Sequence, residues 1–130
     1  AKLELGGMIP AGPGYFYPPT ILTGVTPDMP VANEETFGPV AAIITVKDAE
    51  SALEIANHSR FGLGASVWTK DPSLIDLFTR GLEAGTVFVN AMVKSDPRLP
   101  FGGTKYSGYG RELSHYGLKE FVNIKSVWIN

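Results

Sequence analysis

The sequence predicts an α/β fold in which a parallel βαβαβ sheet is layered with helices. The clearest sign is an almost continuous apolar run over residues 40–46, which is typical of a strand covered on both faces. Two shorter strand-like runs follow at residues 65–69 and 86–90, each after a helical pattern. Because parallel strands are joined by helical crossovers, we expect these three strands to pair in parallel with right-handed connections.

Each expected helix has a recognisable start. Asp48 is expected to cap a helix over residues 49–57, whose apolar positions recur every three or four residues. Asp71 is expected to cap the next helix, because Pro72 suits the first helical position, where its missing N–H costs nothing. This second helix carries one apolar stripe and is expected to end at Gly85. The stripe consists of Leu74, Leu77, Phe78 and Leu82.

The two ends of the chain differ from its middle. Residues 6–19 are rich in glycine and proline, so we expect an extended loop before a short strand over residues 20–23. A loop over residues 91–111 precedes a helix over residues 112–121, and ordered loops of that length are usually functional. The last segment, residues 122–130, would be an apolar strand on both faces and therefore needs a partner strand or subunit.

Composition excludes several classes of function. A chain of 130 residues is long enough for one domain or part of one. Eleven basic and thirteen acidic residues give a net charge of −2 with no basic cluster, so nucleic acid is not an expected partner. No apolar run approaches the ~20 residues needed to cross a bilayer, and no secretory signal is recognisable. We therefore expect a cytoplasmic protein with no membrane partner.

The residues that usually carry covalent or metal chemistry are missing or isolated. The chain has no cysteine, which excludes disulfides, a thiolate nucleophile and Cys-ligated zinc within it. The two histidines, His58 and His115, stand at no metal-ligand spacing, so no metal site is expected. Gly108 and Gly110 suggest a dinucleotide-binding loop, but Leu113 replaces the third glycine and no strand leads into the segment.

A polar cluster, NEETFGP at residues 33–39, stands directly before the first apolar run. Glu34 and Glu35 are not expected to act as a glycosidase-like acid pair, because neighbouring residues of an extended segment point to opposite sides. Only one of the two carboxylates can face a given site. A solvated turn carboxylate is the alternative interpretation of that residue.

Four segments in register resemble the carboxyl-terminal part of the aldehyde dehydrogenase superfamily: EETFGPV, NHSRFGLGASVWTKD, GLEAGTVFVN and LPFGGTKYSGYGREL. In that family a cysteine thiolate attacks the aldehyde, hydride passes to NAD or NADP, and an upstream glutamate assists hydrolysis. These groups and the Rossmann-like domain precede the matched region. The resemblance implies that residues 1–121 are part of a catalytic domain without catalytic residues of its own, inactive alone, and that residues 122–130 are an oligomerisation strand.

The resemblance assigns two residues to the cofactor. The second glutamate of the EETFGP motif, Glu35, is expected to accept hydrogen bonds from the nicotinamide ribose hydroxyls, while Phe37 packs near the nicotinamide. These residue types suit the task, since an ionised carboxylate accepts from two hydroxyls and a flat ring limits where the nicotinamide can lie. Glu34 is expected to be structural.

The resemblance also assigns two residues to the substrate. Phe101 matches the aromatic residue of the family's aldehyde channel, and Ser95 matches a serine that helps to bind the substrate carboxylate in succinate-semialdehyde dehydrogenases. The segment SDPRLPFGG is similar to the corresponding sequence in that group of enzymes. Alternatively, Ser95 forms a turn with Asp96 and Pro97.

The implied partners are an aldehyde, the remainder of the polypeptide and further copies of the same subunit. Two other functions remain open at this point. One is a non-catalytic interaction module with the same fold, and the other is a dehydrogenase for a different carboxylated aldehyde. The glycines of the PFGG segment are expected to serve close backbone packing rather than phosphate binding.

Overall fold

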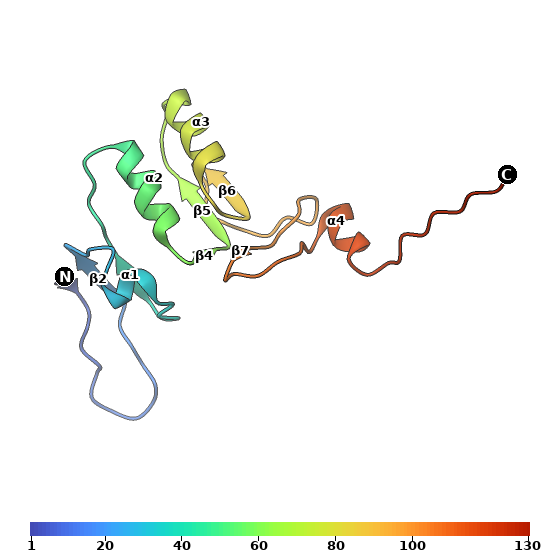
Figure 1. Ribbon diagram of the computed structural model, residues 1–130. Coiled ribbons are helices and arrows are strands. Elements are labelled where there is room, and N and C mark those ends of the chain that lie inside the picture. Colours follow the sequence, from blue (N-terminus) through green and yellow to red (C-terminus); the bar gives the residue numbers. More distant parts are fainter. The chain divides into compact units, whose positions relative to one another are not determined.

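A computed structural model describes residues 1–130, which form two compact units, Ala1–Ser59 and Arg60–Asn130. Helices and strands occur in both units, so the predicted α/β class is confirmed (Figure 1). None of the helices is long and apolar enough to cross a membrane.

The first unit contains a three-stranded sheet in the order β1-β2-β3. Strand β1 (Lys2–Leu5) is antiparallel to β2 (Thr20–Thr23), and β2 is parallel to β3 (Val40–Ala42), with Thr20 opposite Val40. Helix α1 (Pro30–Asn33) lies on the connection between the two parallel strands. The predicted strand over residues 20–23 is therefore present, and it is the central strand of this sheet.

The pairing of β3 differs from the expected arrangement. The sequence predicts that the strand after the EETFGP motif pairs with later strands, but its hydrogen-bonded neighbour is the earlier strand β2. Strand β3 is also shorter than the apolar run, ending at Ala42, although the Ile43 N–H still donates to the Leu22 carbonyl at 2.8 Å. An apolar run shows that a segment is a strand, but it does not identify the neighbouring strand.

A buried threonine ties the aromatic loop, residues 6–19, to this sheet. The Thr20 side chain is 4% exposed, and its Oγ1 accepts from the Gly7 N–H and donates to the Pro18 carbonyl, both at 2.9 Å. The two bonds join both ends of the loop at the first residue of β2. Because the hydroxyl has both partners, its burial carries little penalty.

Helix α2 (Ala49–His58) begins as predicted. The Asp48 carboxylate accepts from the Ser51 N–H at 2.8 Å, which satisfies one of the free donors at the start of the helix. Hydrogen bonds from Ser51 lower the pKa of Asp48, so the ionised form that caps the helix is favoured.

The second unit contains the predicted βαβ crossover. Strand β5 (Gly64–Val67) is parallel to β6 (Thr86–Val89), and helix α3 (Pro72–Gly81) joins them. Asp71 caps this helix through the Ser73 N–H at 2.8 Å, as predicted. The helix ends at Gly81 rather than at Gly85, because the backbone at Leu82 is already extended.

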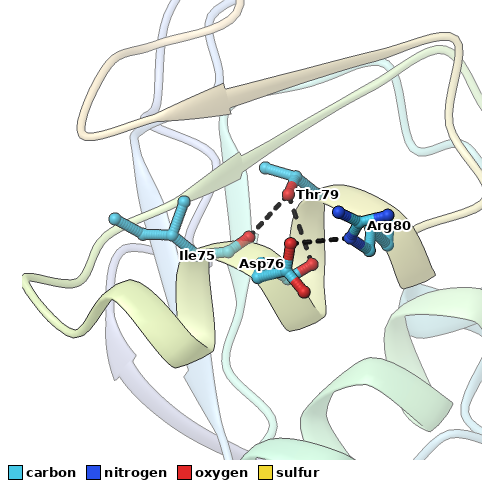
Figure 2. Close-up of polar contacts among 4 residues, drawn as sticks. All are labelled: Ile75, Asp76, Thr79 and Arg80. Atoms are coloured by element: carbon cyan, nitrogen blue, oxygen red, sulfur yellow. Dashed lines mark hydrogen bonds and ion pairs between the residues drawn. The ribbon is translucent and has the colours of Figure 1, made fainter.

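The outer face of α3 is polar. Its Arg80 Nε donates to Asp76 Oδ1 at 2.6 Å, one helical turn earlier, and the Thr79 hydroxyl donates to the Ile75 carbonyl at 2.7 Å (Figure 2). The predicted stripe residues Leu74 and Phe78 are half-buried, whereas the polar residues are exposed. The helix is therefore amphipathic, as its sequence pattern indicates.

A second pair of strands, β4 (Phe61–Gly62) and β7 (Thr104–Lys105), is antiparallel. The PFGG glycines precede β7 in a crowded place: a Cβ at Gly102 would lie 2.6 Å from the Gly110 carbonyl oxygen, and one at Gly103 would lie 2.5 Å from the Ser107 Cβ. The predicted packing role of these glycines is confirmed.

Helix α4 (Ser114–Lys119) is shorter than the predicted helix over residues 112–121. Leu113 and Ser114 have φ values of 64° and 52°, outside the helical region, so the helix does not extend back to Glu112. Residues 122–130 lie in no helix or strand (Figure 1). Their side chains are exposed, including Trp128 at 89%. Their predicted use as an oligomerisation strand requires another chain and stays a prediction.

Few side chains are fully buried in this chain. Val25 and Val67 are the buried apolar residues, whereas Trp68 is 67% exposed. Apolar faces of both units are therefore uncovered here.

Candidate functional site

The cofactor-side motif, residues 34–40, is held in place by backbone hydrogen bonds at both ends. The Glu34 N–H donates to the Pro30 carbonyl at 2.7 Å and closes α1. At the other end, the Pro39 carbonyl accepts from the Thr20 N–H at 2.8 Å, at the start of the parallel pairing of β2 with β3. The side chains between these two bonds are free to serve another purpose.

Phe37 stands out in this motif. Its φ of 47° is in the left-handed region, which is unfavourable for an aromatic residue, and its ring is 91% exposed. The ring lines a cavity of about 530 Å³, together with aromatic residues of the aromatic loop. Because the ring is exposed, its packing does not offset the cost of the positive φ. Strain of this kind is typical of a functional residue.

Glu35 is exposed and has no hydrogen-bond or ion-pair partner in the structure. Its backbone makes no turn hydrogen bond, and it lies two residues before Phe37. Its carboxylate is therefore available to accept hydrogen bonds from two hydroxyl groups of a ligand.

The substrate loop, residues 91–101, belongs to the second unit and follows the carboxyl end of β6. Asn90 turns the chain away from the sheet with a φ of 53°. Its side chain accepts from the Thr69 N–H at 3.0 Å and donates to the Thr69 carbonyl at 2.8 Å. These two bonds fix the start of the loop to the chain that follows β5.

A cavity of about 400 Å³ lies between β6 and the substrate loop. Apolar residues of β6 form one wall, and Phe101 belongs to the other. Phe101 is half-buried, and its N–H and carbonyl bond the backbone of Glu112 at 2.8 and 2.7 Å. The backbone that carries the ring is thus fixed by two hydrogen bonds, which suits a wall of a binding cavity.

Ser95 is exposed and its hydroxyl has no hydrogen-bond partner. The residues on either side of it, Lys94 and Asp96, line the cavity, whereas Ser95 itself does not. The Asp96 carboxylate makes the local turn by accepting from the Arg98 N–H at 2.9 Å, so the serine hydroxyl is not used in it.

The same carboxylate holds a guanidinium. Arg98 donates to both oxygens of Asp96, from Nε at 2.9 Å and from Nη2 at 2.6 Å. These bonds, first of all the side-chain bond from Arg98, hold the pKa of Asp96 well below its usual range. The carboxylate therefore stays ionised and paired at neutral pH.

The structure places the four predicted site residues in two regions. Glu35 and Phe37 belong to the cofactor-side motif of the first unit, and Ser95 and Phe101 belong to the substrate loop of the second unit. No group of His, Cys, Asp and Glu residues suited to a metal ion is present.

Sequence reasoning missed the charged residues around Ser95. The segment K-S-D-P-R shows charges of both signs in this loop, but it does not identify which of them form an ion pair. It also gave no role to Tyr15, Phe16 and Tyr17, which share the cavity of Phe37.

Comparisons with known proteins agree on one family. A model described as "Aldehyde dehydrogenase family" matches residues 1–127. Succinate semialdehyde dehydrogenase [NAD(P)+] of Escherichia coli strain K12 is 56% identical over 128 residues, and succinate-semialdehyde dehydrogenase [NADP(+)] 1 of Mycobacterium ulcerans is 51% identical over 129. The matches cover 98% and 99% of this chain but 28% of each relative, so the chain spans less than a third of their length.

Solved structures give the same result. Indole-3-acetaldehyde dehydrogenase of P. syringae, in complex with NAD+ and IAA, has a TM-score of 0.94 at 42% identity. An aldehyde dehydrogenase of Bacillus cereus in complex with NAD+ has a TM-score of 0.94 at 41% identity. These alignments cover 98% and 99% of this chain and 26% of each solved chain.

Proposed function

Because the chain belongs to the aldehyde dehydrogenase family, we propose that it forms the carboxyl-terminal part of an NAD(P)-dependent enzyme that oxidises succinate semialdehyde to succinate. The observation that supports this substrate is made in the substrate loop. There the Ser95 hydroxyl has no partner, and its sequence neighbours line a cavity with aromatic walls. The names of the Escherichia coli and Mycobacterium ulcerans relatives support the same substrate.

The cofactor-side motif fits a nicotinamide nucleotide. Its exposed, unpartnered carboxylate, Glu35, would accept from the two ribose hydroxyls, and the exposed Phe37 ring would limit where a planar ring can lie. When bound, the nicotinamide would supply the hydride acceptor for oxidation of the thiolate adduct of the aldehyde. Correct placement of the two reacting carbons is the protein's contribution at this step.

The substrate loop fits a carboxylated aldehyde. A carboxylate loses water on entering a cavity, so the site has to return hydrogen bonds, and a hydroxyl donor such as Ser95 does so strongly. The apolar wall of β6 and the ring of Phe101 suit the methylene groups of the substrate.

The nucleophile has to come from outside these 130 residues, because they contain no cysteine. We propose that the remainder of a longer polypeptide supplies it and covers apolar faces that are exposed here. The apolar tail, residues 122–130, would then join another subunit in a homo-oligomer. The cytoplasmic location stays a prediction.

Steady-state kinetics of the longer enzyme test this proposal. We expect kcat/KM for succinate semialdehyde to exceed that for butanal, which has the same number of carbons and no carboxylate, by about tenfold or more. Equal values for the two aldehydes would refute the semialdehyde assignment. A higher value for another carboxylated aldehyde would replace the substrate but keep the class, and a full-length protein without any dehydrogenase activity would favour the interaction module.

A further inference from the structure

The substrate cavity contains a charge arrangement that its apolar walls do not require. We propose that Lys94 selects anionic aldehydes through its positive charge, and that Arg98 makes this possible by masking the carboxylate of Asp96. The inference rests on the proposed function and adds two specificity-determining residues to it.

Two charged residues line the cavity between β6 and the substrate loop, and they have opposite signs. Lys94 and Asp96 are both on the loop side, and the other lining residues are uncharged. If both charges acted equally, the cavity would have no preference for an anion. An unmasked Asp96 would repel a carboxylate, since like charges close together are unfavourable.

Arg98 removes this repulsion. Its guanidinium covers both carboxylate oxygens of Asp96, and the Arg98 N–H adds a third hydrogen bond at 2.9 Å. The Asp96 side chain is 20% exposed, whereas that of Arg98 is 86% exposed, so the cation lies on the solvent side of the pair. A carboxylate with both oxygens bound to a guanidinium has little attraction left for other ions.

Lys94 keeps its charge available. The structure gives its ammonium group no hydrogen bond and no ion pair. Lys94 and Asp96 line the same cavity, and the Lys94 charge also contributes to the low pKa of Asp96, after the contributions of Arg98.

Residues 94–98 thus carry two cations and one carboxylate, a net charge of about +1 on the loop side of the cavity. The Lys94 ammonium, on a residue that lines the cavity, would attract a substrate carboxylate. Electrostatic complementarity of this kind raises specificity and the rate of association, and it weakens as salt screens the charges.

The test uses the longer enzyme and two aldehydes, succinate semialdehyde and butanal. We expect Lys94→Gln to lower the ratio of the two kcat/KM values about tenfold or more, mainly through KM of the semialdehyde, and Lys94→Arg to retain most of it. Lys70→Gln is the matched control, since it removes one positive charge from an exposed lysine that lines no described cavity. It should leave the ratio unchanged.

The masking role has its own variants. Arg98→Gln should lower the same ratio by exposing the Asp96 charge, and Asp96→Asn added to it should restore most of the ratio. Restoration separates a charge effect from a disturbed loop, because the double variant lacks the same ion pair. A double variant as poor as Arg98→Gln would overturn the masking role.

The outcomes also separate this inference from the proposed function. A wild-type enzyme that prefers the semialdehyde, with a ratio that Lys94→Gln leaves unchanged and that does not fall with salt, would overturn the inference and leave the function in place. A wild-type enzyme without that preference would overturn both.

Discussion

The two candidate site regions of this chain are built in different ways. The cofactor-side motif is held by backbone hydrogen bonds, and the side chains of Glu35 and Phe37 have no role in holding it. The substrate loop is held by side chains as well, with Asn90 at its start and Asp96 bound to Arg98 in its middle, besides backbone hydrogen bonds at its end. Substitutions in the first region should therefore change function alone, whereas those in the second can change function and loop geometry together.

The largest expected effect concerns the chain by itself, in which both regions are present. The isolated 130 residues should not oxidise any aldehyde, because they contain no thiolate to form the covalent adduct. The measurement is the formation of reduced nicotinamide cofactor with the purified chain, NAD or NADP, and succinate semialdehyde. Reduction of the cofactor by this chain would show that the nucleophile does not have to come from outside these 130 residues.

The next effect isolates the cofactor-side motif. Glu35→Gln in the longer enzyme should lower kcat/KM for the cofactor by about 10- to 150-fold, since charge-assisted hydrogen bonds to the ribose are lost. The loss should be equal with succinate semialdehyde and butanal, and the melting temperature should not change. Unchanged cofactor KM and hydride-transfer rate would make Glu35 a solvated turn residue.

A third prediction compares the scaffolds of the two regions. Gly103→Ala should lower the free energy of unfolding by about 1 to 3 kcal/mol, because the new Cβ would lie 2.5 Å from the Ser107 Cβ and 2.7 Å from its carbonyl oxygen. Gly38→Ala is the control in the cofactor-side motif, where the nearest atom is the Thr36 carbonyl oxygen at 3.7 Å, and it should change the free energy by less than about 0.5 kcal/mol. Chemical denaturation of the longer enzyme measures both. Equal losses would contradict the account of the PFGG segment.

The smallest expected effect is on stability at Phe37. Phe37→Gly should raise the free energy of unfolding by less than about 1 kcal/mol, because glycine suits a φ of 47° and the ring is 91% exposed. The same variant should raise the cofactor KM. Thr36→Gly, at a residue without positive φ, is the control and should lower stability slightly. Loss of stability at Phe37 would show that the ring packs after all.

Local patterns in the sequence predicted the local structure well. The caps at Asp48 and Asp71 start the two helices, and the βαβ crossover around α3 is parallel. Strand partners were harder, because β3 pairs with the short strand β2, and periodicity carries no information on neighbours. Strand β1 was missed because its sequence, KLEL, alternates polar and apolar residues over only four positions, the shortest run that indicates a strand.

In the candidate site, too, local motifs were predictable from the sequence and contacts between residues were not. Glu35, Phe37, Ser95 and Phe101 could be proposed from short motifs, because each lies in a segment that resembles a known family. The bond between Asp96 and Arg98 could not, since it depends on how a loop turns over three residues. The assignments of the four motif residues stay predictions.

The central claim is that the substrate loop selects a carboxylated aldehyde while the cofactor-side motif serves any aldehyde. The most direct measurement is the ratio of kcat/KM for succinate semialdehyde to that for butanal, taken side by side in the wild-type enzyme, Ser95→Ala and Glu35→Gln. We predict that Ser95→Ala lowers this ratio by about tenfold or more, through the semialdehyde alone, and that Glu35→Gln leaves it unchanged. An equal loss on both aldehydes with Ser95→Ala, or no loss on either, would contradict the claim.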